Sequence, residues 1–197
     1  MKKIITVSFL ALVCCVSFAQ PAASYPEGLK VGDTAPDFTL KDAGGKKINL
    51  KQKLKSGPIV LVFYRGQWCP FCNRHLGVLN DSLQLIKEKG ADLLAISPET
   101  QEGIAKTVNK TRAVFPVLHD VNMVVMKSYK VQYSVDEKTV EKYRGYGIDF
   151  DKANGTNGAN LPVPATYIIG KDGIIKYVFF NTDYRKRPSV KEIIENL

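Results

Sequence analysis

The most constraining feature of the sequence is an apolar segment that runs almost directly into a pair of cysteines. Residues 59 to 64 are aliphatic or aromatic with no polar alternation, which is typical of a strand covered on both faces. Cys69 and Cys72 follow, and further apolar residues then recur at steps of three and four up to Gly90. These helix-face positions are Cys72, Leu76, Leu79, Leu83 and Ile86. The pattern predicts a buried central strand that delivers a Cys-x-x-Cys pair to the start of a helix.

The position of the two cysteines predicts different roles for them. A helix N-terminus presents unpaired N–H groups and a partial positive charge, both of which favour a thiolate. Cys69 lies at the helix start, Pro70 suits the first helical position, and Cys72 lies one turn further on. We therefore expect Cys69 to be the attacking thiol and Cys72 the resolving thiol. Arg65 is placed to lower the pKa of Cys69 further, or else is simply solvated.

Other uses of a cysteine pair fit the sequence less well. A structural disulfide across so short a loop would constrain the unfolded chain very little. Haem attachment requires a histidine directly after the second cysteine, where Asn73 stands, and a zinc site needs more ligands than this pair. A copper-binding chaperone remains the non-enzyme alternative, with His75 or His119 as a further ligand. We expect no metal or other cofactor, and we expect His75 to be an ordinary surface residue.

Three segments carry a resemblance to a known family: Phe63 to Cys72, Leu161 to Ile169, and Asp183 to Arg187. Together they resemble the peroxiredoxin-like branch of the alkyl hydroperoxide reductase/thiol-specific antioxidant (AhpC/TSA) family, within the thioredoxin superfamily. The resemblance implies an α/β thioredoxin-like fold, with a central mixed sheet flanked by helices and an N-terminal hairpin. It also implies a substrate-docking proline before the closing strand, which corresponds to a cis Val163–Pro164 bond here. Trp68 and Phe71 flank the thiols and are expected to form an apolar docking surface.

The sequence departs from the peroxidase pattern of that family at two places. Peroxidatic sites have a hydroxyl residue three positions before the reactive cysteine and an arginine ahead of the closing strand. Gly66 and Pro164 stand at these positions, so transition-state stabilisation of peroxide cleavage should fall unless Arg65 substitutes. Thiol–disulfide exchange needs only an activated attacker, a resolving thiol and a docking surface. We therefore rank exchange with protein or small-molecule disulfides ahead of peroxide reduction through a Cys69 sulfenic acid, with an electron-donating thiol protein as partner in either case.

The N-terminal residues predict export. Lys2 and Lys3 precede an apolar run, and Ser17-Phe18-Ala19 supplies the small residues of a cleavage site before Gln20. We expect residues 1–19 to be a signal peptide, 20–30 an extended segment and 31–197 one thioredoxin-like domain in the periplasm or another extracytoplasmic compartment. Lipoprotein processing at Cys14 or Cys15 is the minor alternative. Cleavage after Ala19 would leave only the Cys69 and Cys72 thiols in the mature protein, without stable membrane insertion.

The formal charge is +9, or +7 without the leader, and one lysine-rich stretch follows the first predicted hairpin turn. These lysines are Lys46, Lys47, Lys51, Lys53 and Lys55. A solvated surface accounts for them, because no nucleic-acid motif accompanies the stretch.

The rest of the chain predicts alternating strands and helices. We expect hairpins over 35–50 and 163–180, strands over 92–96 and 114–118, helices over 97–111 and 122–129, and a terminal helix from Pro188. Residues 131–160 predict an insertion at the rim of the active site. It would contain a helix from Asp136 to Tyr143 and a flexible loop around Gly155 and Gly158.

Overall fold

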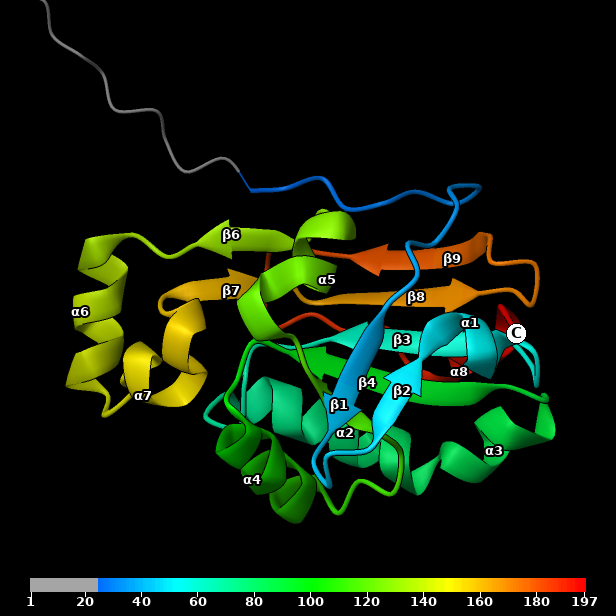
Figure 1. Ribbon diagram of the computed structural model, residues 1–197, viewed down its shortest axis with the longest axis horizontal. Coiled ribbons are helices and arrows are strands. Elements are labelled where there is room, and N and C mark those ends of the chain that lie inside the picture. The colour runs from blue at the N-terminus through cyan, green and yellow to red at the C-terminus, as the bar shows by residue number, and fades with distance from the viewer. Residues whose placement is uncertain (1–24) are drawn as a thin grey trace, which may run out of the picture.

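A computed structural model describes residues 25–197, which form a seven-stranded sheet flanked by helices (Figure 1). The predicted leader and the residues up to 24 lie outside the described part. The strand order is β2-β1-β5-β4-β3-β8-β9. The strands are β1 (Thr39–Asp42), β2 (Lys47–Asn49), β3 (Ile59–Phe63), β4 (Asp92–Ser97), β5 (Val117–His119), β8 (Ala165–Ile169) and β9 (Ile175–Phe180). Within residues 25–197, no helix is long and apolar enough to cross a membrane.

Strand β3 lies in the interior of the sheet, as its apolar run predicted. It pairs in parallel with β4 and antiparallel with β8, so the sheet is mixed. Its side chains alternate between two buried clusters, with Ile59, Leu61 and Phe63 on one face and Val60 and Val62 on the other. Burial on both faces explains why the strand carries no polar alternation.

The two predicted hairpins are confirmed. Strands β1 and β2 pair antiparallel, with Leu40 opposite Ile48. Strands β8 and β9 close the other edge of the sheet through a turn in which Gly173 has a φ of +77°. Between the first hairpin and β3, part of the lysine-rich stretch forms the short helix α1 (Leu50–Leu54), whose N-cap Asn49 accepts a hydrogen bond from the Gln52 N–H.

The cysteine helix differs from the prediction in length. Helix α2 (Pro70–Asp81) ends before Ser82, and α3 (Leu83–Glu88) follows, although all five predicted core residues are buried on one face. Asn80, Asp81 and Ser82 interrupt the helix, since such side chains compete for backbone hydrogen bonds. Helix α4 (Gln101–Thr111) also starts later than predicted, because Thr100 rather than Ser97 is its N-cap. Helices α5 (Val124–Ser128) and α8 (Val190–Glu195) occupy the other predicted helical segments.

Residues 131–160 are more regular than predicted. Strands β6 (Gln132–Ser134) and β7 (Asn160–Pro162) form a small second sheet, and helices α6 (Glu137–Gly145) and α7 (Phe150–Asn154) lie beside it (Figure 1). The predicted flexible loop is wrong, because its asparagines are anchored. The Asn157 amide is buried and donates to the carbonyls of Pro98 and Asp120 at 2.7 and 2.9 Å. Gly155 and Gly158 adopt positive φ beside this anchor.

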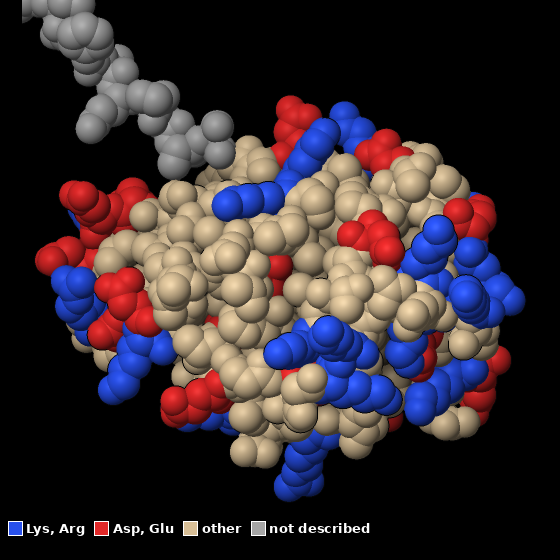
Figure 2. Space-filling view, in the orientation of Figure 1, with Lys and Arg blue, Asp and Glu red and all other residues tan. Residues whose placement is uncertain are grey.

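Charged side chains are spread over the surface (Figure 2). Lysine and arginine gather over the face that carries α1 and the first hairpin, while acidic and basic side chains are mixed over α6 and α7. This face includes the predicted lysine-rich stretch, of which Lys53 pairs with Asp92 at 2.8 Å.

Candidate active site around Cys69 and Cys72

Cys69 lies where β3 gives way to α2, as the sequence predicted. It is the N-cap of α2, and its Sγ accepts a hydrogen bond from the Cys72 backbone N–H at 3.4 Å. Pro70 occupies the first helical position, where its missing N–H breaks no helical hydrogen bond. Both cysteines are unbridged, and both are buried, at 1% and 0% exposure. A cavity of about 450 Å³ reaches Cys69 but not Cys72, so only Cys69 is open to a substrate.

A guanidinium group, that of Arg187, lies against Cys72. Arg187 Nη2 donates to Cys72 Sγ at 3.2 Å, and its Nη1 donates to the carbonyls of Tyr184 and Lys186. These carbonyl contacts orient the guanidinium toward the sulfur. Sequence reasoning missed Arg187, although it lies within the Asp183 to Arg187 signature whose role could not be derived from the sequence.

The pKa values of the two thiols are therefore shifted in opposite directions. Burial works against ionisation of Cys72, but its side-chain hydrogen bond with Cys69 and the charge of Arg187 outweigh burial and lower the pKa of Cys72 to about 6. The same hydrogen bond, together with burial, raises the pKa of Cys69 above its ordinary value. The resting reduced pair accordingly shares one proton, carried by Cys69 and donated to the Cys72 thiolate. The expectation that the pKa of Cys69 is lowered is not met, because its hydrogen bond with Cys72 and its burial outweigh the charge of Arg65, which lowers that pKa.

Arg65 is not solvated, which excludes one of the two predictions made for it. Its side chain is 2% exposed and its guanidinium carbon lies 4.3 Å from the ring centre of Tyr184 and 4.9 Å from that of Trp68. Its Nη2 donates to the Tyr143 hydroxyl. Arg65 also lines the cavity that reaches Cys69, so a guanidinium stands in the wall of the site.

The predicted insertion supplies the aromatic wall. Trp68 packs edge-on against Tyr143 from α6 and Phe150 from α7, with ring centres 5.5 and 5.6 Å apart. Phe71 is 40% exposed and packs against Tyr184. Trp68 and Phe71 both line the cavity beside Cys69, as their predicted docking role requires.

A buried carboxyl group, that of Glu99, holds the loop before Cys69. Glu99 Oε1 accepts from the Gln67 N–H at 2.6 Å, and its Oε2 accepts from the hydroxyls of Tyr64 and Thr107 at 3.3 and 3.1 Å. Burial raises the pKa of Glu99 in spite of these donors. Gly66 fits against this group, because a Cβ there would lie 2.6 Å from Trp68 Nε1 and 3.0 Å from Glu99 Oε1. A hydroxyl residue has no room at this position.

Two predictions near the pair are wrong. The Val163–Pro164 bond is trans, since no peptide bond within residues 25–197 is cis. Trans is the lower-energy form for most X–Pro bonds, and buried Pro164 does not line the cavity that reaches Cys69. His75 is buried, at 8% exposure, rather than on the surface. Burial and the charge of Arg187 lower the pKa of His75 to about 3, so it is neutral.

Comparisons with known proteins show the family and the fold of the chain. The model of the AhpC/TSA family matches residues 31–178. The chain is 30% identical over 169 residues to peroxiredoxin Q, chloroplastic, of Triticum aestivum, covering 84% of this chain and 67% of the relative. It is also 30% identical over 137 residues to the thiol-disulfide oxidoreductase ResA of Bacillus anthracis, covering 61% and 78%.

Solved structures show the same fold. Peroxidoxin BcpB from Mycobacterium tuberculosis matches with a TM-score of 0.66 at 23% identity, covering 85% of this chain and 96% of that one. A peroxiredoxin-like protein from Aquifex aeolicus matches with a TM-score of 0.67 at 17% identity, covering 88% and 89%. The predicted thioredoxin-like fold is confirmed. Within residues 25–197, no group of three or more histidine, cysteine, aspartate or glutamate side chains is placed to hold a metal ion.

Proposed function

Because the chain belongs to the AhpC/TSA family, within the thioredoxin superfamily, we propose that it is a thiol oxidoreductase whose Cys69–Cys72 pair catalyses dithiol–disulfide exchange. The observation that carries the proposal is the asymmetry of the pair. Cys69 opens onto an aromatic cavity, whereas Cys72 is enclosed and its thiolate is held by Arg187. Relatives named as peroxiredoxins and as thiol-disulfide oxidoreductases both support thiol chemistry.

The geometry gives each cysteine a task. The Cys72 thiolate takes the proton of Cys69, and the Cys69 thiolate then attacks one sulfur of a substrate disulfide lying in the cavity. A mixed disulfide forms and the other substrate sulfur leaves as a thiolate, which takes up a proton. Cys72 loses its proton again and attacks Cys69 Sγ, which closes the protein disulfide and releases the second substrate thiol. The helix N-terminus favours the Cys69 thiolate during attack, and Arg187 favours the Cys72 thiolate before and after it. An electron-donating thiol protein then reduces the pair again.

Peroxide reduction is the second candidate, and two arginines, the buried Arg65 and the half-buried Arg187, favour it. Arg65 and Arg187 bring guanidinium groups to the cysteine site, where the sequence offered only Arg65. In that reaction the Cys69 thiolate would attack a peroxide oxygen, leaving a sulfenic acid and releasing an alcohol or water. Cys72 would then condense with the sulfenic acid to give the same disulfide and water. The hydroxyl donor is still absent, because Gly66 has no room for a side chain.

The redox potential of the pair tests the exchange proposal through its pH dependence. In the folded protein the pKa of Cys72 is about 6, below the ordinary value of about 8.5. Its thiolate therefore stabilises the reduced protein fully above about pH 8.5, and this contribution is lost as the pH falls through 6. Reduction takes up one proton above pH 6 and two below it. A plot of the redox potential against pH should therefore bend near pH 6. The potential should fall by about 30 mV per pH unit above this bend and by about 60 mV per pH unit below it.

The variant Arg187→Met removes the cause of the bend. We expect it to move the bend to higher pH and to make the pair more reducing by about 30 mV at pH 7, as measured by equilibration in glutathione buffers and thiol trapping. Arg185→Met is the matched control, because Arg185 is exposed and paired with Asp183. A single slope of about 60 mV per pH unit from pH 5 to 8 would contradict the role of Arg187, as would equal shifts of the redox potential in both variants.

We further propose that the protein is exported after cleavage behind Ala19. The basic start, the apolar run and the small residues before Gln20 support this. Mass spectrometry of the protein from an exporting host should find Gln20 as the first residue. Retention of Met1, or a lipid on Cys14 or Cys15, would contradict the proposal.

A further inference from the structure

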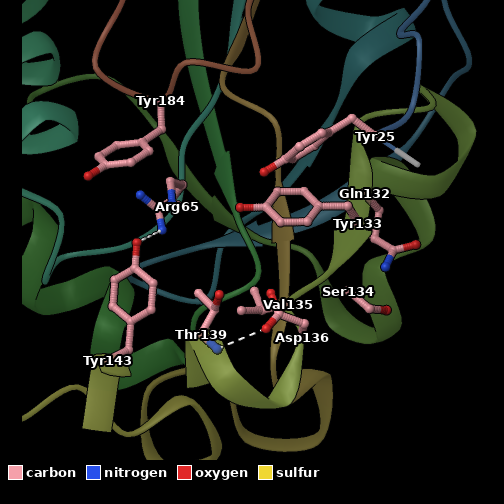
Figure 3. Close-up of a pocket in the computed structure, with 10 residues that line it drawn as sticks. All are labelled: Tyr25, Arg65, Gln132, Tyr133, Ser134, Val135, Asp136, Thr139, Tyr143 and Tyr184. Atoms are coloured by element: carbon pink, nitrogen blue, oxygen red, sulfur yellow. Dashed lines mark hydrogen bonds between the residues drawn. The ribbon is translucent and has the colours of Figure 1, made fainter. Parts of the chain in front are cut away.

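A second cavity adjoins the one that reaches Cys69. Its volume is about 460 Å³, and the two cavities share Arg65, Tyr143, Tyr184 and Thr139 in their walls. Figure 3 shows Arg65 between the rings of Tyr184 and Tyr143, with another pair of tyrosine rings across the cavity. That pair is Tyr25 and Tyr133, whose ring centres lie 5.0 Å apart. A cavity of this size would hold part of a substrate whose sulfur lies at Cys69.

Arg65 brings a buried positive charge to this junction without an acidic partner. Within residues 25–197 the Tyr143 hydroxyl is the one acceptor that its guanidinium contacts, its Nε has no partner, and it takes part in no salt bridge. By contrast, the exposed Arg144 and Arg185 pair with Glu141 and Asp183. Buried charges are normally paired, so the guanidinium of Arg65 retains donors for an anion.

The charged groups near Arg65 leave its guanidinium free to bind an anion from solution. The guanidinium that contacts the Cys72 thiolate, at 3.2 Å, is that of Arg187, whereas Arg65 acts on Cys72 through its backbone N–H and a smaller effect of its charge. The acidic residue of the second cavity, Asp136, is exposed, and its Oδ1 accepts from the Thr139 N–H at the start of α6. It therefore caps a helix rather than neutralising Arg65. The two arginines differ in their partners: Arg187 holds the protein's own sulfur anion, and Arg65 faces the cavities.

From this we propose that Arg65 binds a carboxylate of the substrate, so that the preferred substrates are disulfides that carry a carboxylate a few bonds from sulfur. The planar fork of a guanidinium matches the two oxygens of a carboxylate, and the flanking rings of Tyr184 and Tyr143 hold its plane in place. The tyrosine-lined second cavity would take the apolar part of such a substrate. This inference rests on the proposed exchange function, whose substrate class it names.

Binding can be measured without any redox reaction. Trp68 is the one tryptophan of the sequence and lies 4.9 Å from the Arg65 guanidinium carbon, so its fluorescence reports on the site. The probes are 3-phenylpropionate and its neutral isostere 3-phenylpropanamide, added to the oxidised protein. We expect saturable binding of the carboxylate and at least tenfold weaker binding of the amide. Equal binding of the two, or no binding of either, would overturn the inference, and this comparison needs no variant.

Variants then assign the effect to one side chain. Arg65→Met should remove the preference for the carboxylate, and Arg65→Lys should retain part of it because the charge stays while the fork is lost. Arg144→Met is the matched control, since it removes the same charge from the exposed face of α6 without touching the cavity. A carboxylate preference that survives in Arg65→Met would overturn the assignment to Arg65.

Turnover separates this inference from the proposed function. Reduced protein is mixed with 3,3′-dithiodipropionate or with bis(2-hydroxyethyl) disulfide, each of which yields two thiols as the protein dithiol becomes a disulfide. We expect a several-fold lower KM for the dicarboxylate, with similar kcat, and loss of the difference in Arg65→Met. Equal rates for both disulfides, without 3-phenylpropionate binding, would overturn the carboxylate site and leave exchange intact. Binding of 3-phenylpropionate without exchange of either disulfide would overturn the function and leave the site.

Discussion

Replacing Cys69 with serine should abolish turnover of disulfide substrates, whereas replacing Cys72 with serine should leave a protein that attacks once and then stalls. The reason is the division of tasks in the pair. Cys69 alone lines the substrate cavity, so no other thiol in the described chain can begin the reaction. Cys72 is enclosed behind it and is needed only to take the proton and to release the mixed disulfide.

The two variants are distinguished by what accumulates. Mass spectrometry of Cys72→Ser after mixing with a disulfide should show one substrate thiol attached at Cys69, and Cys69→Ser should show none. Near-ultraviolet circular dichroism of both variants controls for folding, because each replaces a sulfur in the same buried cluster. If Cys72 instead carried the adduct in Cys69→Ser, or alkylated faster than Cys69 in the reduced wild type, the assignment of roles would be reversed.

Local sequence patterns predicted the strand and the helix that carry the cysteine pair, because these elements are close together in the chain. The apolar run of β3, the proline after Cys69 and the spacing of Leu76 and Leu79 each report on their own neighbourhood. Together they gave the correct place of Cys69 at the helix start. The same reasoning placed a helix beside Tyr143, which the structure has as α6.

The charges of the site could not be predicted in the same way, because they depend on contacts between distant segments. Arg187 lies 115 residues from Cys72 in the chain. Glu99 reaches the Gln67 N–H from a turn after another strand, and no pattern around it indicates burial. The surface assignment of His75 failed for a related reason, since its burial and the nearby charge of Arg187 come from the tertiary structure and not from the helix sequence. The cis form of the Pro164 bond was carried over from the family resemblance and is not found in the structure.

The second large expected effect is selectivity for disulfides over hydrogen peroxide. A peroxide O–O bond breaks with negative charge on the leaving oxygen, and each donor missing from such a site typically costs about a hundredfold in rate. Gly66 cannot be replaced by a hydroxyl residue without a clash at Trp68 and Glu99. Arg187 is already engaged by the Cys72 thiolate, so Arg65 is the remaining donor at the cavity. Disulfide exchange needs neither donor, because the leaving thiolate is itself stable near neutral pH.

The most direct measurement is stopped-flow oxidation of the reduced protein, followed through Trp68 fluorescence, with hydrogen peroxide and with a disulfide in parallel. We expect the disulfide to oxidise the pair far faster than it oxidises a free thiol, and peroxide to show little advantage over its reaction with a free thiol. Arg65→Met and the control Arg144→Met should then react equally slowly with peroxide. The account would be contradicted if peroxide oxidised Cys69 orders of magnitude faster than a free thiol and Arg65→Met removed that advantage, since disulfide exchange would then be only the recycling half of a peroxidase cycle.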